Sequence, residues 1–183
     1  KPAPKPALKP TPKPAPKPAP KPAPKPTEKP KETTPKQDKS QSKVQSGWVG
    51  SSYYENGVKV TNKWIFDKKA NSYFYLNASG NYVQNAWVGN YYLKSDGKRA
   101  KNEWFYDKKY SAHYYLTSEG SSARNTWVGN YYLKSDGKRA KNEWVDGGRY
   151  YVDSDGKKVK SEWIYDKNYG SYYYLTAEGS YAR

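Results

Sequence analysis

A ladder of seven tryptophans constrains the fold of this chain more than any other feature of the sequence. The intervals between them are 16, 23, 17, 23, 17 and 19 residues, so short and long steps alternate within a unit of about 40 residues. The run from Trp87 to Trp104 also recurs letter for letter from Trp127 to Trp144. Such a period indicates stacked copies of one supersecondary unit rather than a single irregular domain. The ladder consists of Trp48, Trp64, Trp87, Trp104, Trp127, Trp144 and Trp163.

The composition changes sharply near Gly47, which divides the chain into two predicted regions. All 14 prolines lie between Pro2 and Pro35, mostly in a K-P-A-P tract, whereas every aromatic residue follows Gly47. Proline fixes φ and holds the preceding residue extended, so the tract favours polyproline II. We therefore expect residues 1–46 to be an extended or disordered Lys/Pro-rich linker and residues 47–183 to be the folded repeat module.

Within each repeat, the residue pattern predicts a β-hairpin. Every tryptophan is followed by an aromatic pair, a mostly aliphatic residue, and a turn that contains glycine. One hairpin of this size is not stable alone in water, so successive hairpins must stack. Aliphatic residues are sparse, and we expect tyrosine and tryptophan to supply most of the buried area. The predicted fold is all-β: a solenoid of seven hairpins, each opened by a tryptophan, with the last one truncated near Arg183.

Several functional classes are disfavoured by the residues present. The chain has no cysteine and one histidine, His113, while its acidic residues recur at equivalent repeat positions such as Asp96 and Asp136. Recurrence in every repeat favours a structural role, so we predict no catalytic residues and no enzyme activity. The D-S-D-G sequence at 153–156 lacks the further oxygen ligands of a calcium loop, so no metal site is expected. The net charge of +16 is spread over both regions, which disfavours nucleic acid, and no apolar run has membrane length.

Regularly spaced aromatic rings can also form cages for organic cations. Several ring faces around a quaternary ammonium attract it through cation–π interactions without any counter-charge. A hairpin solenoid could form such a cage wherever the rings of neighbouring hairpins converge.

The pattern G-W-V…Y-Y-L…D-G-x-x-x…W, in register over seven units, resembles the choline-binding repeats of streptococcal surface proteins and autolysins. The Lys-Pro tract beside the repeats is also typical of that family. The resemblance implies a left-handed superhelix that binds choline or phosphocholine of teichoic and lipoteichoic acids between hairpins, without a cofactor. It also implies an extracellular protein held non-covalently on the cell wall.

Four positions form the family's cage: the opening tryptophan, the residue before the aromatic pair, the residue two after the turn glycine, and the next tryptophan. The resemblance carries these positions over to the long repeats as choline-binding residues. The first implied cage is fully aromatic, the second is depleted, and the third lacks its closing tryptophan. They are Trp64, Tyr73, Tyr82 and Trp87; Trp104, His113 and Trp127; and Trp163, Tyr172 and Tyr181.

The short repeats carry lysine or arginine at the third cage position, for example Arg99 and Arg139. A fixed cation there repels a second cation and can itself stack on the rings. We therefore expect the short-repeat junctions to be filled by the protein's own cations. On this view Trp87→Ala weakens choline binding more than Trp144→Ala.

Two alternatives remain open at the level of the sequence. Related glucan-binding repeats also present tryptophan and tyrosine platforms, so a carbohydrate ligand is one alternative. The other is that the chain is the anchoring part of a cell-wall hydrolase whose catalytic domain lies outside it.

Overall fold

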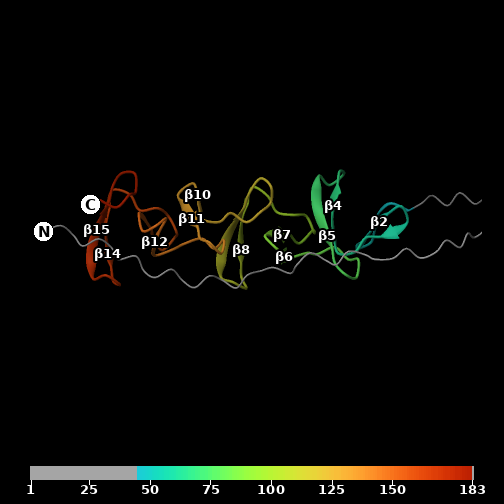
Figure 1. Ribbon diagram of the computed structural model, residues 1–183, viewed down its shortest axis with the longest axis horizontal. Helices are drawn as coiled ribbons and strands as arrows, with labels where there is room; N and C mark the ends of the chain where they lie inside the picture. Colours follow the sequence, from blue (N-terminus) through green and yellow to red (C-terminus); the bar gives the residue numbers. More distant parts are fainter. Residues whose placement is uncertain (1–44, 183) are drawn as a thin grey trace, which may run out of the picture.

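The computed structural model describes residues 45–182, so the linker prediction for residues 1–46 lies almost entirely outside the described residues. The described part contains strands and turns but no helix, as the sequence predicted. Figure 1 shows the hairpins following one another along the long axis, which confirms the stacked-hairpin solenoid. The strands are β1 (Gly47–Val49), β2 (Ser52–Glu55), β3 (Val58–Lys59), β4 (Lys63–Asp67), β5 (Ser72–Leu76), β6 (Ala86–Val88), β7 (Tyr91–Leu93), β8 (Glu103–Asp107), β9 (Ala112–Leu116), β10 (Thr126–Val128), β11 (Tyr131–Leu133), β12 (Glu143–Val145), β13 (Tyr150–Val152), β14 (Glu162–Asp166) and β15 (Ser171–Leu175).

Seven antiparallel hairpins are formed by β1-β2, β4-β5, β6-β7, β8-β9, β10-β11, β12-β13 and β14-β15, with β3 added to the first. Each tryptophan lies in the first strand, directly opposite one ring of the aromatic pair. Trp87 faces Tyr92, for example, and their ring centroids lie 5.2 Å apart at a steep interplanar angle. Cross-strand aromatic pairs of this kind stabilise a hairpin, which explains why the tryptophan and the pair recur together.

The segment after each turn glycine joins its own hairpin to the preceding one. Arg99 forms a bridge with Leu93 of its own hairpin, while its backbone N–H donates to the carbonyl oxygen of Tyr73, one hairpin earlier, at 3.0 Å. Tyr82 likewise bridges Leu76 and donates to the carbonyl of Ser51 at 2.9 Å. The residue two positions after the turn glycine therefore bonds to the previous hairpin. Its identity decides which side chain enters the junction between the two hairpins.

The aliphatic residue after the aromatic pair forms the most deeply buried layer of the solenoid. The largest side chains with almost no exposure are all leucine or valine at this position, although aliphatic residues are sparse overall. Tyrosine and tryptophan surround this layer and remain partly exposed in most repeats. Leucine and valine therefore add a fully buried layer to the aromatic packing that the sequence predicted. The layer consists of Leu76, Leu93, Leu116, Leu133, Val152 and Leu175.

Glycine is required at the turns because the preceding repeat packs closely against them. Gly97 has a φ of +82°, and a Cβ atom there would lie 2.6 Å from the ring of Tyr82. Any larger residue would meet both backbone strain and a steric clash. The Asp-Gly signal in the sequence therefore marks a contact between repeats as well as a turn.

Candidate functional site

The aromatic rings between hairpins form two kinds of site. In three of them, which we call cation-filled cages, a lysine or arginine of the chain lies over rings from two successive hairpins. In three others, which we call packed clusters, the corresponding position holds tyrosine or serine and the rings pack on one another. Which kind forms at a junction follows directly from which residue stands two positions after the turn glycine of the next hairpin.

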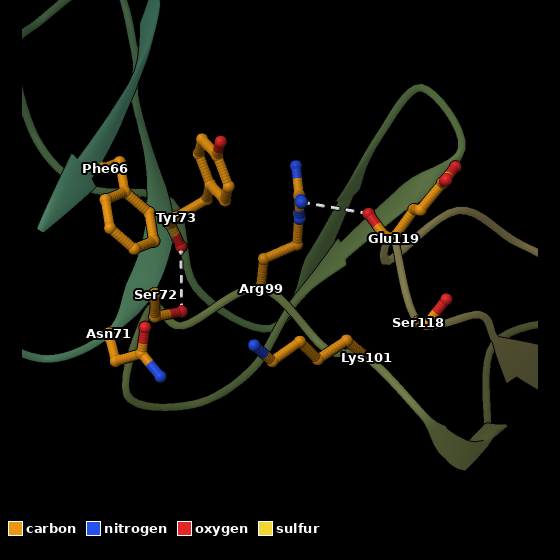
Figure 2. A pocket seen from close by; sticks show the side chains of 8 residues that line it. All are labelled: Phe66, Asn71, Ser72, Tyr73, Arg99, Lys101, Ser118 and Glu119. Carbon is orange, nitrogen blue, oxygen red and sulfur yellow. Dashed lines mark hydrogen bonds between the residues drawn. The ribbon is translucent and has the colours of Figure 1, made fainter. Parts of the chain in front are cut away.

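The first cation-filled cage is built from β4-β5 and β6-β7. The guanidinium carbon of Arg99 lies 4.1 Å from the ring centroid of Tyr73, 4.7 Å from that of Tyr91 and 5.6 Å from that of Trp64. One guanidinium nitrogen also donates to the backbone carbonyl of Glu119 at 2.9 Å, as Figure 2 shows. These distances are those of cation–π contacts. The cage therefore already holds a cation, supplied by the protein.

The second cation-filled cage repeats this arrangement two hairpins later. The guanidinium carbon of Arg139 lies 4.5 Å from the ring centroid of Tyr131 and 5.4 Å from that of Trp104. The backbone N–H of Arg139 donates to the carbonyl of His113, which occupies the position of Tyr73. Burial, with smaller contributions from Arg139 and Lys141, lowers the pKa of His113 below its usual value. His113 is therefore neutral at pH 7 and adds no further charge.

The third cation-filled cage contains lysine. The ammonium nitrogen of Lys158 lies 4.2 Å from the ring centroid of Trp127 and 4.6 Å from that of Tyr150. Burial is the main cause that lowers the pKa of Lys158, and neighbouring Lys160 contributes. The ammonium lies between two rings and partly out of water, which disfavours its charged form and lowers its pKa.

The packed clusters are centred on Trp48, Trp87 and Trp144. Trp87 contacts Tyr114 with ring centroids 5.0 Å apart, and Phe105 at 6.1 Å. Its indole N–H donates to the buried carboxylate of Asp107 at 2.9 Å. Tyr114 is itself buried, and this burial, with the nearby carboxylates Asp107 and Asp136, raises its pKa to about 12. The rings and the hydrogen bond fill these clusters, which makes them packing elements of the solenoid.

All four short-repeat tryptophans share this hydrogen bond to an aspartate of the next hairpin. Besides Trp87, the donors are Trp48 to Asp67, Trp127 to Asp146, and Trp144 to Asp166. The hydrogen bond from Trp48 is the largest cause that lowers the pKa of Asp67. Each of these aspartates is thus a link between neighbouring hairpins.

The structure brings together only part of each set of predicted site residues. Trp64 and Tyr73 do meet, but Tyr82 contacts Trp48, with ring centroids 5.8 Å apart, in the preceding packed cluster. Trp87 forms a packed cluster of its own. The grouping of Trp64, Tyr73, Tyr82 and Trp87 in one cage is therefore corrected. Its physical reason is the backbone bond from residue 82 to Ser51, which carries the Tyr82 ring one hairpin back.

The two other predicted groups are divided by the same rule. Trp104 lies in the second cage and the backbone carbonyl of His113 accepts a hydrogen bond from Arg139, whereas Trp127 belongs to the third cage. Tyr181 contacts Trp144, with ring centroids 5.9 Å apart, and completes that packed cluster. Trp163 and Tyr172 lie at the last described hairpin and are 64% and 67% exposed. They hold the same positions in their repeat as Trp64 and Tyr73 hold in theirs.

Arginine does stack on aromatic rings, as the sequence led us to expect, but at other junctions. Arg99 and Arg139 belong to short repeats in the sequence and cover the rings of the preceding long repeats. Sequence reasoning also omitted the rings of Tyr91, Tyr131 and Tyr150, each the first member of the next aromatic pair. The verbatim repeat contains both the arginine and this tyrosine, but their partners one hairpin back are visible only in three dimensions.

Residues 45–182 contain no cluster of three histidine, cysteine or acidic side chains that could hold a metal ion. The same part of the chain has no helix of the length and apolarity needed to cross a membrane. A cleft of about 380 Å³ does lie beside the first cage. Its lining comprises Phe66, Asn71, Ser72, Tyr73, Arg99, Lys101, Ser118 and Glu119 (Figure 2).

Comparison with known proteins places these repeats among solved relatives. The chain is similar to the modular autolysin LytC of Streptococcus pneumoniae, with 44% identity and a TM-score of 0.69 over 74% of this chain and 32% of LytC. It is also similar to the choline-binding domain of CbpL from Streptococcus pneumoniae, with 48% identity and a TM-score of 0.66 over 74% of each chain.

Two sequence comparisons agree with the structural ones. A putative endo-beta-N-acetylglucosaminidase of Streptococcus pneumoniae is 39% identical over 51 residues, which are 26% of this chain and 8% of that protein. The chain thus spans about a third or less of these two enzymes. The sequence model described as "Choline-binding repeat" matches residues 81–121 and 121–158. With its hairpin stacking and aromatic cages, the chain belongs to the family of choline-binding repeat proteins.

Proposed function

We propose that this chain is a non-catalytic module that attaches a protein to choline-bearing polymers of the cell wall. The observation that carries the proposal is that three inter-hairpin cages already hold cations of the chain itself. Ring faces arranged to hold a guanidinium or an ammonium also suit a quaternary ammonium. Choline would take the place of the internal cation at these junctions.

Each cage alone would bind weakly. A few cation–π contacts supply the favourable part of the binding free energy. After the cost of association and of displacing the internal cation, a binding free energy of about −4 kcal/mol or a weaker value remains, which corresponds to millimolar affinity. Several cages along one solenoid would engage a polymer that carries many choline groups and raise the overall affinity. The exposed rings of Trp163 and Tyr172 would add a partial site at the last described hairpin.

Teichoic and lipoteichoic acids that carry phosphocholine fit the charge of the chain. A net charge of +16 favours a polymer with phosphate groups, and the ammonium groups would occupy the cages. Such a partner would place the protein outside the cell, on the wall surface. The similarity to LytC and to the CbpL choline-binding domain supports a choline-bearing partner in the cell wall.

The proposal that the module lacks catalytic activity is supported by the roles of its acidic residues. Asp67, Asp107, Asp146 and Asp166 accept hydrogen bonds from tryptophans, and Asp96 accepts one from a turn amide. The first four carboxylates link neighbouring hairpins and Asp96 stabilises its own turn, so they do not converge on one cleft. A catalytic domain elsewhere in a longer protein is compatible with this role.

Retention on a quaternary-amine resin tests the proposed function. A chain with a net charge of +16 is repelled by a cationic matrix unless its cages bind the immobilised ammonium groups. We expect retention and elution by choline chloride, whereas sodium chloride at the same concentration leaves the protein bound. Flow-through without retention, or equal elution by the two salts, would contradict choline recognition.

A further inference from the structure

We propose that Arg99 and Arg139 make their cages selective for phosphocholine over choline. The inference rests on the proposed function and assigns the two arginines a part in it. In the free protein each guanidinium occupies the aromatic faces. In the bound state it turns to the phosphate while the trimethylammonium group takes its place on the rings.

The first step of the argument is that the ligand's ammonium and the guanidinium compete for one position. The guanidinium of Arg99 lies within 5.6 Å of three rings, so a second cation on those rings would be close to it and repelled. Choline can therefore enter only by displacing Arg99. It offers the displaced guanidinium no partner, so choline alone gains little from the exchange.

The second step is that Arg99 can leave the rings without being buried elsewhere. Apart from the rings, the guanidinium has a hydrogen bond to the carbonyl of Glu119, at the rim of the cleft beside the cage. Figure 2 shows the side chains of Arg99 and Lys101 facing this cleft opposite Tyr73 and Phe66. An anion in the cleft would meet two cations, while the carboxylate of Glu119 points away from Arg99 in Figure 2.

The third step is the match between the ligand and this arrangement. Phosphocholine carries its phosphate two methylene groups from the ammonium, so one molecule can reach both the rings and the cleft. A guanidinium binds phosphate through two parallel hydrogen bonds, which replace the cation–π contacts that Arg99 gives up. Phosphocholine therefore turns a competing cation into a partner, whereas choline does not.

The second cage has the same two cations because the sequence from Trp87 to Trp104 recurs from Trp127 to Trp144, although His113 stands there in the place of Tyr73. Arg139 and Lys141 correspond to Arg99 and Lys101, and Arg139 also lies over two rings. The third cage differs because Lys158 presents a point charge and lacks the planar fork of arginine. We assign the selectivity to the two arginine cages.

Calorimetric titration of the full chain with choline and with phosphocholine tests the inference. We expect the parent protein to bind phosphocholine about tenfold more tightly, the equivalent of one charge-assisted hydrogen bond. In the double variant Arg99→Met and Arg139→Met, choline binding should strengthen, phosphocholine binding should weaken, and the two affinities should become similar. Methionine retains the length of the side chain, and the backbone bonds of both positions to the preceding hairpin do not depend on the side chain.

Arg124→Met is the matched control. Arg124 bonds to the side chain of Asn90 and the carbonyl of Ser135, and its replacement removes one positive charge without touching a cage. We expect it to preserve the preference for phosphocholine. If this control loses the preference as fully as the double variant, general charge rather than Arg99 and Arg139 sets it, and the inference fails.

Two results would overturn the selectivity while leaving the proposed function intact. One is equal affinity of the parent for choline and phosphocholine. The other is a double variant that binds both ligands more tightly by the same factor, because the arginines would then only block the cages. Absence of binding by either ligand would instead remove the proposed function itself. An NMR readout separates a phosphate contact from a structural role: the Arg99 side-chain protons should lose their ring-current shielding on addition of phosphocholine.

Discussion

Replacing Trp87 with alanine is expected to destabilise the repeats around it by about 3 kcal/mol, the lower end of the cost of removing a buried tryptophan, because its ring is partly buried. The side chain packs against Tyr92, Phe105 and Tyr114, and its N–H satisfies the buried carboxylate of Asp107. The substitution therefore leaves a cavity and removes a hydrogen bond from a carboxylate that stays buried. Chemical denaturation, with hydrogen exchange at β6 to β9, measures the loss where it occurs.

Trp163→Ala is the matched control for this prediction. Trp163 is 64% exposed, so its removal should cost less than about 1 kcal/mol. Trp144→Ala should resemble Trp87→Ala, because Trp144 also packs on aromatic rings and bonds to a buried aspartate. If Trp87→Ala costs no more than Trp163→Ala, the packed clusters are not the elements that hold the hairpins together.

A loss of about 2–5 kcal/mol is also expected for Leu116→Ala. Leu116 is fully buried between Tyr92, Ala100 and Phe105, and it lies in the aliphatic layer that continues through the solenoid. Removing three heavy atoms there creates a cavity that the backbone of stacked hairpins cannot easily close. Because each repeat contacts only its neighbours, hydrogen exchange should report the largest loss in β6-β7 and β8-β9.

Val58→Ala is the control for this second prediction. Val58 is 69% exposed on β3, and its truncation should change the unfolding free energy by less than about 0.5 kcal/mol. A Leu116→Ala protein as stable as the Val58→Ala protein would show that the aliphatic layer is dispensable. In that case the aromatic rings would carry the stability of the solenoid.

The hairpin solenoid was predictable because the sequence repeats its signals in register. The tryptophan of each first strand, the aromatic pair opposite and the glycine turn recur at fixed offsets, and each has a local structural reason. The contribution of Leu93 and its equivalents to the core was harder to predict, because one leucine in each repeat is not enough to form a core by itself. Their importance comes from stacking, which places these leucines in one continuous layer.

The membership of each cage was not predictable from the spacing along the chain. Tyr73 and Tyr82 are close in sequence and belong to the same repeat, yet Tyr73 meets Arg99 and Tyr82 meets Trp48. The difference arises because the segment after each turn bonds to the preceding hairpin, so its side chains enter an earlier junction. A backbone hydrogen bond between residues of different hairpins cannot be inferred from the composition or from the repeat period of the sequence.

The cations of the chain also change the meaning of the tryptophan ladder. Trp48, Trp87 and Trp144 act as packing residues, while Trp64, Trp104 and Trp127 face a cation supplied by the next repeat. The internal cation contacts these rings when no ligand is present. A ligand would therefore have to gain more interaction free energy on the rings than the internal cation loses when it leaves them.

The most direct measurement is a titration of the full chain with phosphocholine, followed by NMR through the indole N–H signals of the seven tryptophans. The signals of Trp64, Trp104 and Trp127 are expected to shift and saturate, because these rings exchange an internal cation for the ligand. Those of Trp48, Trp87 and Trp144 should move little, because neighbouring rings and an aspartate already occupy their surroundings. Saturable shifts confined to Trp48, Trp87 and Trp144, or no saturable shift at any tryptophan, would contradict ligand binding at the cation-filled cages.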